Sequence, residues 1–460
     1  MNSAHCRHRS LAGNLARLLL GLLPPSMLVA GGRPLAAAPA QPPIQPPIVA
    51  PVRRPTVNYA VREQTAPPAI RNLLNQMRQE IAAGGLQFSV GYTTALDFKL
   101  EQITGARPPE DITVRSLQQN ALAMQLRKVD LATRAEAAKH IRLPELQIQC
   151  SANARTWDWR RLGKVTPIRN QSPCGTCWDF GSLAALESSY AIRNNQIIDA
   201  SEQQILACAV GNDGNDAGKC PFPPGGWHAP VFEYLVSTGT ARDSDYLYTG
   251  ADSPCNADVA LPYRAVAWGY VTTEVSPGFE SIRIPTVAEM KQALCEYGPL
   301  AVAVLATSQF QAYTGGADGN DVFKQNLSDA TLHPVNGATN KKRNSINHLI
   351  TLIGWDDNKN AWLIKNSWGT GWGGTGGFGT EGGYMWIDYN TNNIGFGAAW
   401  VQAQNRFYKL PQEYYKLHRV PIKPLPDPGP LTPGIIRPLP RSTSPRTRIP
   451  ALPRLRIPAQ

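Results

Sequence analysis

The sequence predicts an α+β fold, and three observations lead to it. Residues 181–195 are rich in Ala, Leu and Glu and place apolar side chains along one face of a helix. The second half of the chain instead contains apolar runs of strand length, such as LITLIG at residues 349–354. Both lie in a block from Trp157 to about Arg406 that is rich in Trp, Gly, Asn and Tyr. A block of this length can bury a substantial core.

The first 38 residues have the layout of a secretory signal peptide. A basic start precedes an apolar run from Leu18 to Ala30, which is followed by PLAAAPA. We expect cleavage near Ala38 or Ala40, because small residues of this kind precede signal cleavage sites. The apolar run is too short and too interrupted by proline to span a membrane. The pattern therefore predicts export to the extracellular space or the periplasm, where disulfides can form.

Proline-rich segments flank the folded part on both sides. Residues 39–68 predict an extended linker of Pro, Ala and Gln without the capacity to form a core. Residues 409–460 predict a basic, disordered or polyproline-like tail. From residue 411 onward, nine Lys and Arg against two Asp and Glu give +7 of the formal net charge of +11. The tail could bind a partner or an anionic surface, or simply be solvated, and no nucleic-acid partner is expected.

Residues 69–150 predict a small folded region of mixed structure, with a strand-like FSVGY between two helical patterns. Apolar residues recur at helical spacing in residues 69–83, and residues 113–140 form a long helical pattern. No set of polar residues in this region resembles a catalytic site. The region is either an accessory domain or a propeptide that covers a neighbouring active site.

The stretch NQSPCGTCWDF, residues 170–180, holds a cysteine where a loop enters a helix. Backbone N–H groups and the positive end of the helix dipole would stabilise a thiolate at Cys177. Seven cysteines remain after signal removal, so one free thiol and three disulfides are the simplest arrangement. Pairing with Cys174 as a redox CxxC, or a zinc site, is the alternative, but the chain has no second CxxC for zinc. No metal or cofactor is therefore expected.

Six stretches resemble the motifs of the papain-like cysteine peptidase family, in that family's order, over about 250 residues. They are residues 158–188, SEQQILAC (201–208), KCPFPPGGW (219–227), DYLYTGADSPC (245–255), INHLITLIGW (346–355) and WLIKNSWGTGWGG (362–374). The resemblance implies a peptidase domain at 151–408 with a two-lobe fold and a catalytic cleft between the lobes. The helical first lobe would run to about Pro262. The β-rich second lobe would have strands near residues 300–305, 348–355, 361–365 and 383–388.

The same resemblance implies a catalytic role for four residues. Cys177 would be the nucleophile, and His348 would lower its pKa by an ion pair and then protonate the leaving amine. Asn366 would orient the imidazole, and Gln171 would offer a side-chain N–H to the oxyanion. Taken alone, His348 is an ordinary core histidine and Asn366 a turn residue; only their combination with Cys177 favours catalysis.

The resemblance also implies that five further residues belong to the substrate-binding part of the site. Gly225 and Gly226 would let the substrate backbone approach, although both could be simple turn residues. Ile346 and Leu349 would line an apolar pocket, and Trp368 would shield the Asn–His hydrogen bond from water.

The resemblance also implies the disulfides Cys174–Cys220 and Cys208–Cys255. By parity, Cys150 and Cys295 remain, and they either pair or are free thiols.

The chain departs from the family's pattern at several places. Asp179 replaces a small residue, and its charge should oppose ionisation of the nearby thiol. Insertions are expected at 274–286, 314–345 and 374–382. The second could border the cleft and restrict substrates, or be a surface loop without a role.

The sequence thus predicts a secreted, monomeric, papain-like cysteine endopeptidase that is made as a precursor and acts on proteins or peptides through a thioester on Cys177. One alternative is a protein that binds peptides or surfaces on the same fold without cutting them. Another is an exopeptidase or transpeptidase in which the insertion at 314–345 blocks one end of the cleft.

Overall fold

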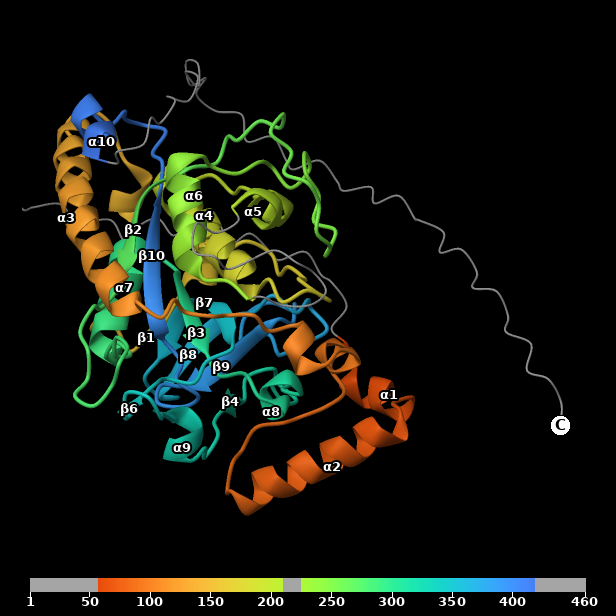
Figure 1. Ribbon diagram of the computed structural model, residues 1–460. Helices are drawn as coiled ribbons and strands as arrows, with labels where there is room; N and C mark the ends of the chain where they lie inside the picture. Colours follow the sequence, from red (N-terminus) through yellow and green to blue (C-terminus); the bar gives the residue numbers. More distant parts are fainter. Residues whose placement is uncertain (1–56, 210–224, 418–460) are drawn as a thin grey trace, which may run out of the picture. The chain divides into compact units, whose positions relative to one another are not determined.

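An eight-stranded β-sheet is the main β-structure of the protein, which is described by a computed structural model over residues 57–209 and 225–417 (Figure 1). All described residues belong to one structural unit. The sheet has the order β2-β10-β3-β7-β8-β9-β4, and β1 pairs with β7. The bounds are β1 Thr156–Asp158, β2 Ala265–Tyr270, β3 Leu300–Val304, β4 Val322–Phe323, β7 His348–Asp356, β8 Ala361–Lys365, β9 Tyr384–Asp388 and β10 Phe396–Ala403. A separate pair consists of β5, Val335–Asn336, and β6, Lys341–Lys342.

The predicted α+β class is confirmed, with helices in the first part of the peptidase region and most strands in the second. The strands expected near 300–305, 348–355, 361–365 and 383–388 are β3, β7, β8 and β9. Neighbouring strands are antiparallel, except that β4 runs parallel to β9. The sequence analysis did not identify β2 and β10. The side chains of β7 are buried on both faces, which explains its continuous apolar run.

Helix α4, Cys177–Asn194, packs on β7 and β10 and is buried along its whole length. A one-sided apolar pattern predicts a half-exposed helix, whereas α4 is covered on all sides. The other helices of this region are η4 Trp159–Leu162, α5 Glu202–Cys208, α6 His228–Ser237, α7 Val287–Tyr297, α8 Ser308–Gln311 and α9 Asp329–Leu332. In the described part of the chain, no helix is both long enough and apolar enough to cross a membrane.

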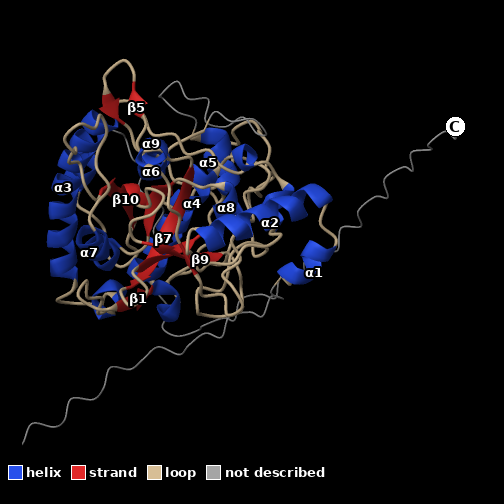
Figure 2. Cartoon of the chain, turned by 90° about the horizontal axis from the view of Figure 1, so that it is seen from below, coloured by secondary structure: helices blue, strands red, loops and turns tan. Residues whose placement is uncertain are grey.

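The accessory region contains the helices that the sequence predicts, and it packs against the sheet region. Its elements are α1 Tyr59–Gln64, α2 Pro68–Ala83, η1 Thr94–Asp97, η2 Leu100–Gln102, α3 Ile112–Ala137 and η3 Pro144–Gln147. Leu74 of α2 and Leu126 of α3 both join the hydrophobic cluster that contains the sheet residues. Strands lie between α3 on one side and α1 and α2 on the other (Figure 2). The accessory region thus buries apolar residues against the sheet region, and its role as an accessory domain or a propeptide stays a prediction.

Two predicted boundaries also change. Residues 59–64, expected to be extended linker, form α1, because the side chain of Asn58 caps its first turn. Residues 412–417, expected to be disordered tail, form α10, Gln412–Leu417, in which Tyr414 is fully buried. The signal peptide, linker residues 39–56, Cys220 and tail residues 418–460 lie outside the described residues.

The insertions at 274–286 and 314–345 pack against each other. Glu280 accepts from the Asn336 side chain at 3.0 Å and forms an ion pair with Arg343. The second insertion also contacts the accessory region, since Ser89 donates to Asp321 at 2.8 Å.

Candidate active site

Cys177 is the first residue of α4, so the backbone N–H groups of the first turn surround it. Its side chain is fully buried, and it is the free cysteine of the described residues. Backbone N–H groups of Leu349, of Gly105 and Ala106 in the accessory region, and of Trp178 lie near the sulfur and favour its charged form. Burial outweighs these donors and raises the pKa of the thiol to about 12.

His348 is the first residue of β7 and is also fully buried. Its Nε2 and Oδ1 of Asn366, which follows β8, are 2.8 Å apart. The Trp368 ring lies over the imidazole with centroids 4.6 Å apart, so it covers this hydrogen bond. Burial lowers the pKa of His348 to about 4, although the bond to Asn366 favours the charged form.

No hydrogen bond joins Cys177 to His348 among the described residues, and their ion pair stays a prediction. Nδ1 of His348 is buried and has no hydrogen-bond partner. With a raised thiol pKa and a lowered imidazole pKa, both side chains are neutral at neutral pH. The reason is the exclusion of water, because desolvation penalises both charged forms.

Gln171, in the loop that precedes Cys177, is fully buried. Its Nε2 donates to the carbonyl oxygens of Cys174, at 2.8 Å, and Ile103, at 3.2 Å. Its Oε1 accepts from the Ser367 hydroxyl at 2.6 Å, which fixes the orientation of the amide. The indole N–H of Trp368 donates to the same Ile103 carbonyl at 3.0 Å. Two side-chain N–H groups therefore converge on one carbonyl oxygen.

Residues 103–107, which we call the blocking segment, run through the site as an extended backbone. The N–H groups of Gly105 and Ala106 donate to the Asn347 carbonyl at 2.9 and 2.8 Å. Gly226 N donates to the Gly105 carbonyl and Arg107 N to the Gly226 carbonyl, both at 2.9 Å. The backbone of the blocking segment is thus held on both sides.

Glycines make this close approach possible. A Cβ on Gly105 would lie 2.0 Å from the Gly175 carbonyl oxygen, and one on Gly225 would lie 1.9 Å from the Gly105 carbonyl oxygen. A Cβ on Gly226 would meet the Trp178 ring at 2.6 Å. The sequence analysis missed Gly105 and Asn347, because both act through their backbones and carry no distinctive side chain.

The residues expected to line an apolar pocket lie beside the blocking segment. Leu349 is fully buried in the hydrophobic cluster that contains Ala106, Cys177 and Trp178, and Ile346 packs against that cluster. Their role in substrate selection stays a prediction.

Asp179 differs from the expectation that its charge opposes thiol ionisation. The carboxyl is fully buried, and neither oxygen has a hydrogen-bond partner. Burial, with a smaller contribution from nearby Glu202, raises the pKa of Asp179 well above its ordinary value. Burial without a donor or a cation favours the neutral form of a carboxyl group. The raised pKa therefore weakens the expected opposition of Asp179 to ionisation of the thiol.

The structure contains the disulfides Cys208–Cys255 and Cys150–Cys295. Both are pairings considered in the sequence analysis. Cys174 is also disulfide-bonded, and Cys220 lies outside the described residues.

Comparison with known proteins gives one consistent result. The sequence profile of the family described as "Papain family cysteine protease" matches residues 153–402. Cysteine proteinase 2 of Entamoeba histolytica is 35% identical over 225 residues, which are 48% of this chain and 61% of that protein. Fruit bromelain of Ananas comosus is 30% identical over 242 residues, 52% of this chain and 56% of that protein. The chain thus spans about three fifths of the length of these relatives.

A solved structure of the bromelain protease from Ananas comosus, in complex with the E64 inhibitor, is also similar. It is 28% identical, with a TM-score of 0.40, and the match covers 54% of this chain and 99% of that one.

Proposed function

The chain belongs to the papain family of cysteine proteases, and we propose that it is a secreted cysteine endopeptidase made as an inactive precursor. One observation carries the proposal. An extended peptide backbone, the blocking segment, lies against the Cys177 thiol between Gly226 and Asn347. A cleft that binds one peptide through main-chain hydrogen bonds can bind others, which makes proteins or peptides the substrates.

The proposed chemistry begins when the blocking segment leaves. Water then reaches Cys177 and His348, and proton transfer from thiol to imidazole becomes less costly. The thiolate attacks the substrate carbonyl carbon, and the oxyanion accepts from the Gln171 side chain and the backbone N–H of Cys177. His348, oriented by Asn366, protonates the leaving amine. Water activated by His348 then hydrolyses the thioester.

The precursor would be inactive for two physical reasons. The blocking segment already uses the N–H groups of Gln171 and Trp368 on the Ile103 carbonyl. It also buries Cys177, which raises the pKa of the thiol and removes the nucleophile.

Export rests on the sequence pattern of residues 1–38, which we propose are a signal peptide. The disulfides Cys208–Cys255 and Cys150–Cys295 support an oxidising compartment. We assign residues 151–408 to the peptidase domain and the residues after 417 to a tail that either binds a partner or is solvated.

The test is intact mass over time of the wild type and Cys177→Ala, in mildly acidic buffer with a thiol reductant. We expect only the wild type to shorten, and we expect an epoxide thiol inhibitor to add once, at Cys177. Failure of the inhibitor to react with the shortened wild-type protein would argue for a peptide-binding protein instead. Shortening of both chains alike would point to a contaminating protease.

A comparison of end-blocked and free peptides separates endopeptidase from exopeptidase action. Cleavage of peptides blocked at both ends supports the proposal. Cleavage restricted to free ends would indicate that the insertion at 314–345 closes one end of the cleft.

A further inference from the structure

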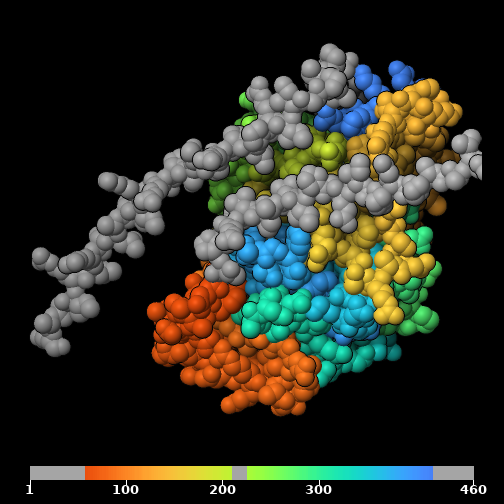
Figure 3. Space-filling view, turned by 180° about the vertical axis from the view of Figure 1, so that it is seen from behind, coloured from red at the N-terminus to blue at the C-terminus, as the bar shows by residue number. Residues whose placement is uncertain are grey.

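The accessory region is attached to the sheet region in two different ways. Residues 57–107 hold α1, α2 and the blocking segment, and residues 112–150 hold α3. The two parts lie at opposite ends of the molecule, with α3 beside α10 (Figures 1 and 3). A short connection, residues 108–111, joins them; Glu110 and Asp111 are exposed, and the two prolines before them are partly exposed.

Neutral hydrogen bonds and apolar contacts hold the first part, whose Leu74 is buried in the same hydrophobic cluster as Leu126 of α3. What the first part lacks, among the described residues, is a buried ion pair to the sheet region. Thr93 donates to the Gln311 carbonyl at 2.7 Å, and the Gln311 side chain donates to the Ala95 carbonyl at 2.7 Å. The ion pairs found in this part, Arg62–Asp97 and Arg78–Glu63, are internal to it. Two further bonds involve carboxylates, from Ser89 to Asp321 and from Gln309 to Glu80, and neither carboxylate is buried. Water can therefore replace these bonds when residues 57–107 depart.

Helix α3, by contrast, completes the sheet. Strand β2 is at the sheet edge, where it presents backbone groups without a neighbouring strand. The side-chain amide of Asn120 donates to the Tyr270 carbonyl at 2.9 Å and accepts from Tyr270 N at 2.8 Å. Gln119 donates to the Trp268 carbonyl at 2.7 Å. The two amides thus take the place of a further strand along β2.

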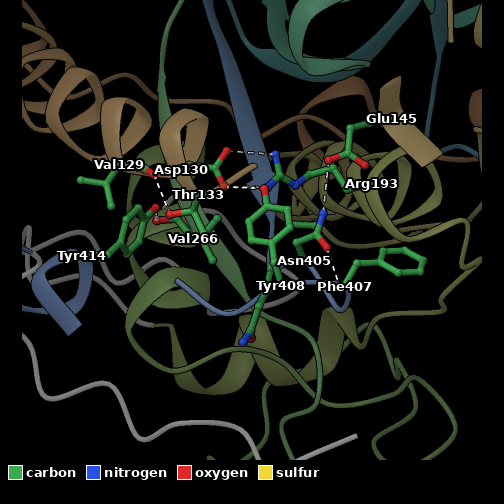
Figure 4. Close-up of polar contacts among 12 residues, drawn as sticks. Val129, Asp130, Thr133, Glu145, Arg193, Val266, Asn405, Phe407, Tyr408 and Tyr414 are labelled. Atoms are coloured by element: carbon green, nitrogen blue, oxygen red, sulfur yellow. Dashed lines mark hydrogen bonds and ion pairs between the residues drawn. The ribbon is translucent and has the colours of Figure 1, made fainter. Parts of the chain in front are cut away.

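A buried ion pair joins α3 to the helix that carries Cys177 (Figure 4). Asp130 is fully buried and lies 2.9 Å from the guanidinium of Arg193, which is 4% exposed and near the end of α4. The Tyr408 hydroxyl donates to Asp130 and accepts from Arg193, each at 2.8 Å. Removal of α3 would leave Arg193 buried without this carboxylate, which is strongly destabilising.

Apolar and covalent contacts add to this attachment. Leu126 of α3 is buried in the same hydrophobic cluster as Trp400 and Tyr414, and α10 packs on α3. The disulfide Cys150–Cys295 joins the end of the accessory region to α7. Cleavage of the chain between α3 and Cys150 would separate α3 from this disulfide. The hydrogen bonds, ion pair and apolar contacts of its side chains would then still hold α3 on the sheet region.

We propose that residues 108–111 are the proteolytic processing site of the precursor, and that α3 remains as a permanent part of the mature enzyme. Hydrolysis of one peptide bond there, with water supplying the new carboxylate and amine, frees the blocking segment to leave with α1 and α2. The boundary of the propeptide then lies near residue 111 and not near residue 150. This inference rests on the proposed function, because it describes how that precursor matures.

The first test is the N-terminal sequence of wild-type protein after activation, isolated through its reaction with the epoxide inhibitor. We expect the sequence to begin between residues 109 and 112. An inhibitor-reactive form that lacks α3, on a reducing gel and by mass, would overturn the inference.

A second test does not depend on Cys177 chemistry. In Cys177→Ala, the recognition sequence of a site-specific protease is inserted between Glu110 and Asp111, and in a matched control between Ser151 and Ala152. After cleavage at the first site, we expect the N-terminal fragment to separate on gel filtration in mild acid, with the melting temperature of the remainder unchanged. After cleavage at the second site and reduction, we expect α3 to stay bound.

Release of α3 from the control after reduction, with an unchanged melting temperature of the remainder, would overturn the inference. It would do so even if the wild type proved inactive, so failure of the inference and failure of the proposed function are distinguishable.

A substitution tests the buried ion pair directly. Asp130→Ala should lower the melting temperature of the processed protein by roughly 5 °C, because Arg193 stays buried without its partner. Lys128→Ala, at an exposed position of the same helix, is the matched control and should change it by less than about 1 °C. Equal effects of the two substitutions would contradict a structural role for α3.

Discussion

At the scale of single residues, burial keeps the side chains of Cys177 and His348 neutral. Burial holds the pKa of Cys177 at about 12 and that of His348 at about 4, so neither is charged between these pH values. Entry of water after release of the blocking segment lowers the cost of the charged forms. Under the proposed function, the same atoms would be inert in the precursor and suited to nucleophilic attack afterwards.

Removal of the Gln171 side chain tests its role at the oxyanion. In the processed enzyme, Gln171→Ala should lower kcat by roughly 10²–10³-fold, as expected for the loss of one oxyanion donor. KM should change little, because the donor acts mainly on the developing charge. Steady-state kinetics with a peptide substrate measure both. Gln118→Ala, at an exposed position of α3, is the control. An equal loss of kcat in this control would contradict the role of Gln171 as an oxyanion donor.

Asp179 should make stability depend on pH. Its pKa is raised in the folded protein, whereas in the unfolded chain it is about 3.9. Above pH 4 the unfolded state loses this proton and the folded state keeps it, so the free energy of unfolding falls as pH rises, until the folded pKa is reached. Asp179→Asn should therefore match the wild type near pH 4 and become more stable by up to about 1.4 kcal/mol per pH unit above it.

Urea unfolding at several pH values measures this difference. Asp258→Asn, at an exposed position, should show no such trend. A constant difference between Asp179→Asn and wild type from pH 4 to 7 would contradict a protonated Asp179. The kinetic pKa of the thiol should be equal in both proteins.

At the scale of elements, the blocking segment depends on close backbone contact. It lies between Gly226 and Asn347, with its hydrogen bonds on both sides. Ile103 and Ala106 add buried apolar contacts, and the absence of Cβ atoms at Gly105, Gly225 and Gly226 allows the close backbone approach.

A side chain at Gly105 should therefore open the precursor. In Gly105→Val, the new Cβ collides with the Gly175 carbonyl, and the segment cannot hold its hydrogen bonds. We expect the rate of Cys177 modification by an epoxide inhibitor in the unprocessed protein to rise at least about tenfold, since an exposed thiol is more readily ionised. Mass spectrometry over time measures this rate.

Gly337→Ala is the control, because nothing lies within 4 Å of a Cβ there. An unchanged rate in Gly105→Val would show that the segment does not limit access to the thiol.

At the scale of the whole molecule, the accessory region surrounds the sheet from two ends (Figure 2). The disulfide Cys150–Cys295 closes a loop with a sequence separation of 145 residues. A cross-link between residues so far apart restricts the unfolded chain strongly.

Loss of this disulfide should destabilise the precursor without removing activity. The double variant Cys150→Ser/Cys295→Ser should lose roughly 2–5 kcal/mol of unfolding free energy. Its processed form should keep the wild-type kcat/KM, because Cys295 belongs to α7 and Cys150 precedes β1, outside the elements that carry Cys177 and His348. Chemical denaturation and steady-state kinetics check the two parts. A loss of kcat/KM with an unchanged free energy of unfolding would contradict the expectation that the disulfide acts on stability alone.

Much of the fold was predictable because its signals are local. Helices α2 and α3 follow from apolar residues at helical spacing, and β7 from its apolar run. Helix α1 escaped notice because so short a helix depends on its cap more than on composition. Strand β10, FGAAWVQA, contains Gly, Ala and Gln, and its formation depends on pairing with β2 and β3 in the sheet.

By itself, the sequence determined the α+β class and the candidate residues Cys177, His348, Asn366 and Gln171, because motif order and residue type are written in the chain. Only the tertiary structure decided the protonation of Cys177 and Asp179, since the pKa of a group depends on water and neighbours brought together by folding. It also decided that Gly105 lies against the backbone of Gly175 and Gly226 and that the side chains of α3 bond to the edge of β2. Contacts between segments more than a hundred residues apart leave no local pattern that a sequence could show.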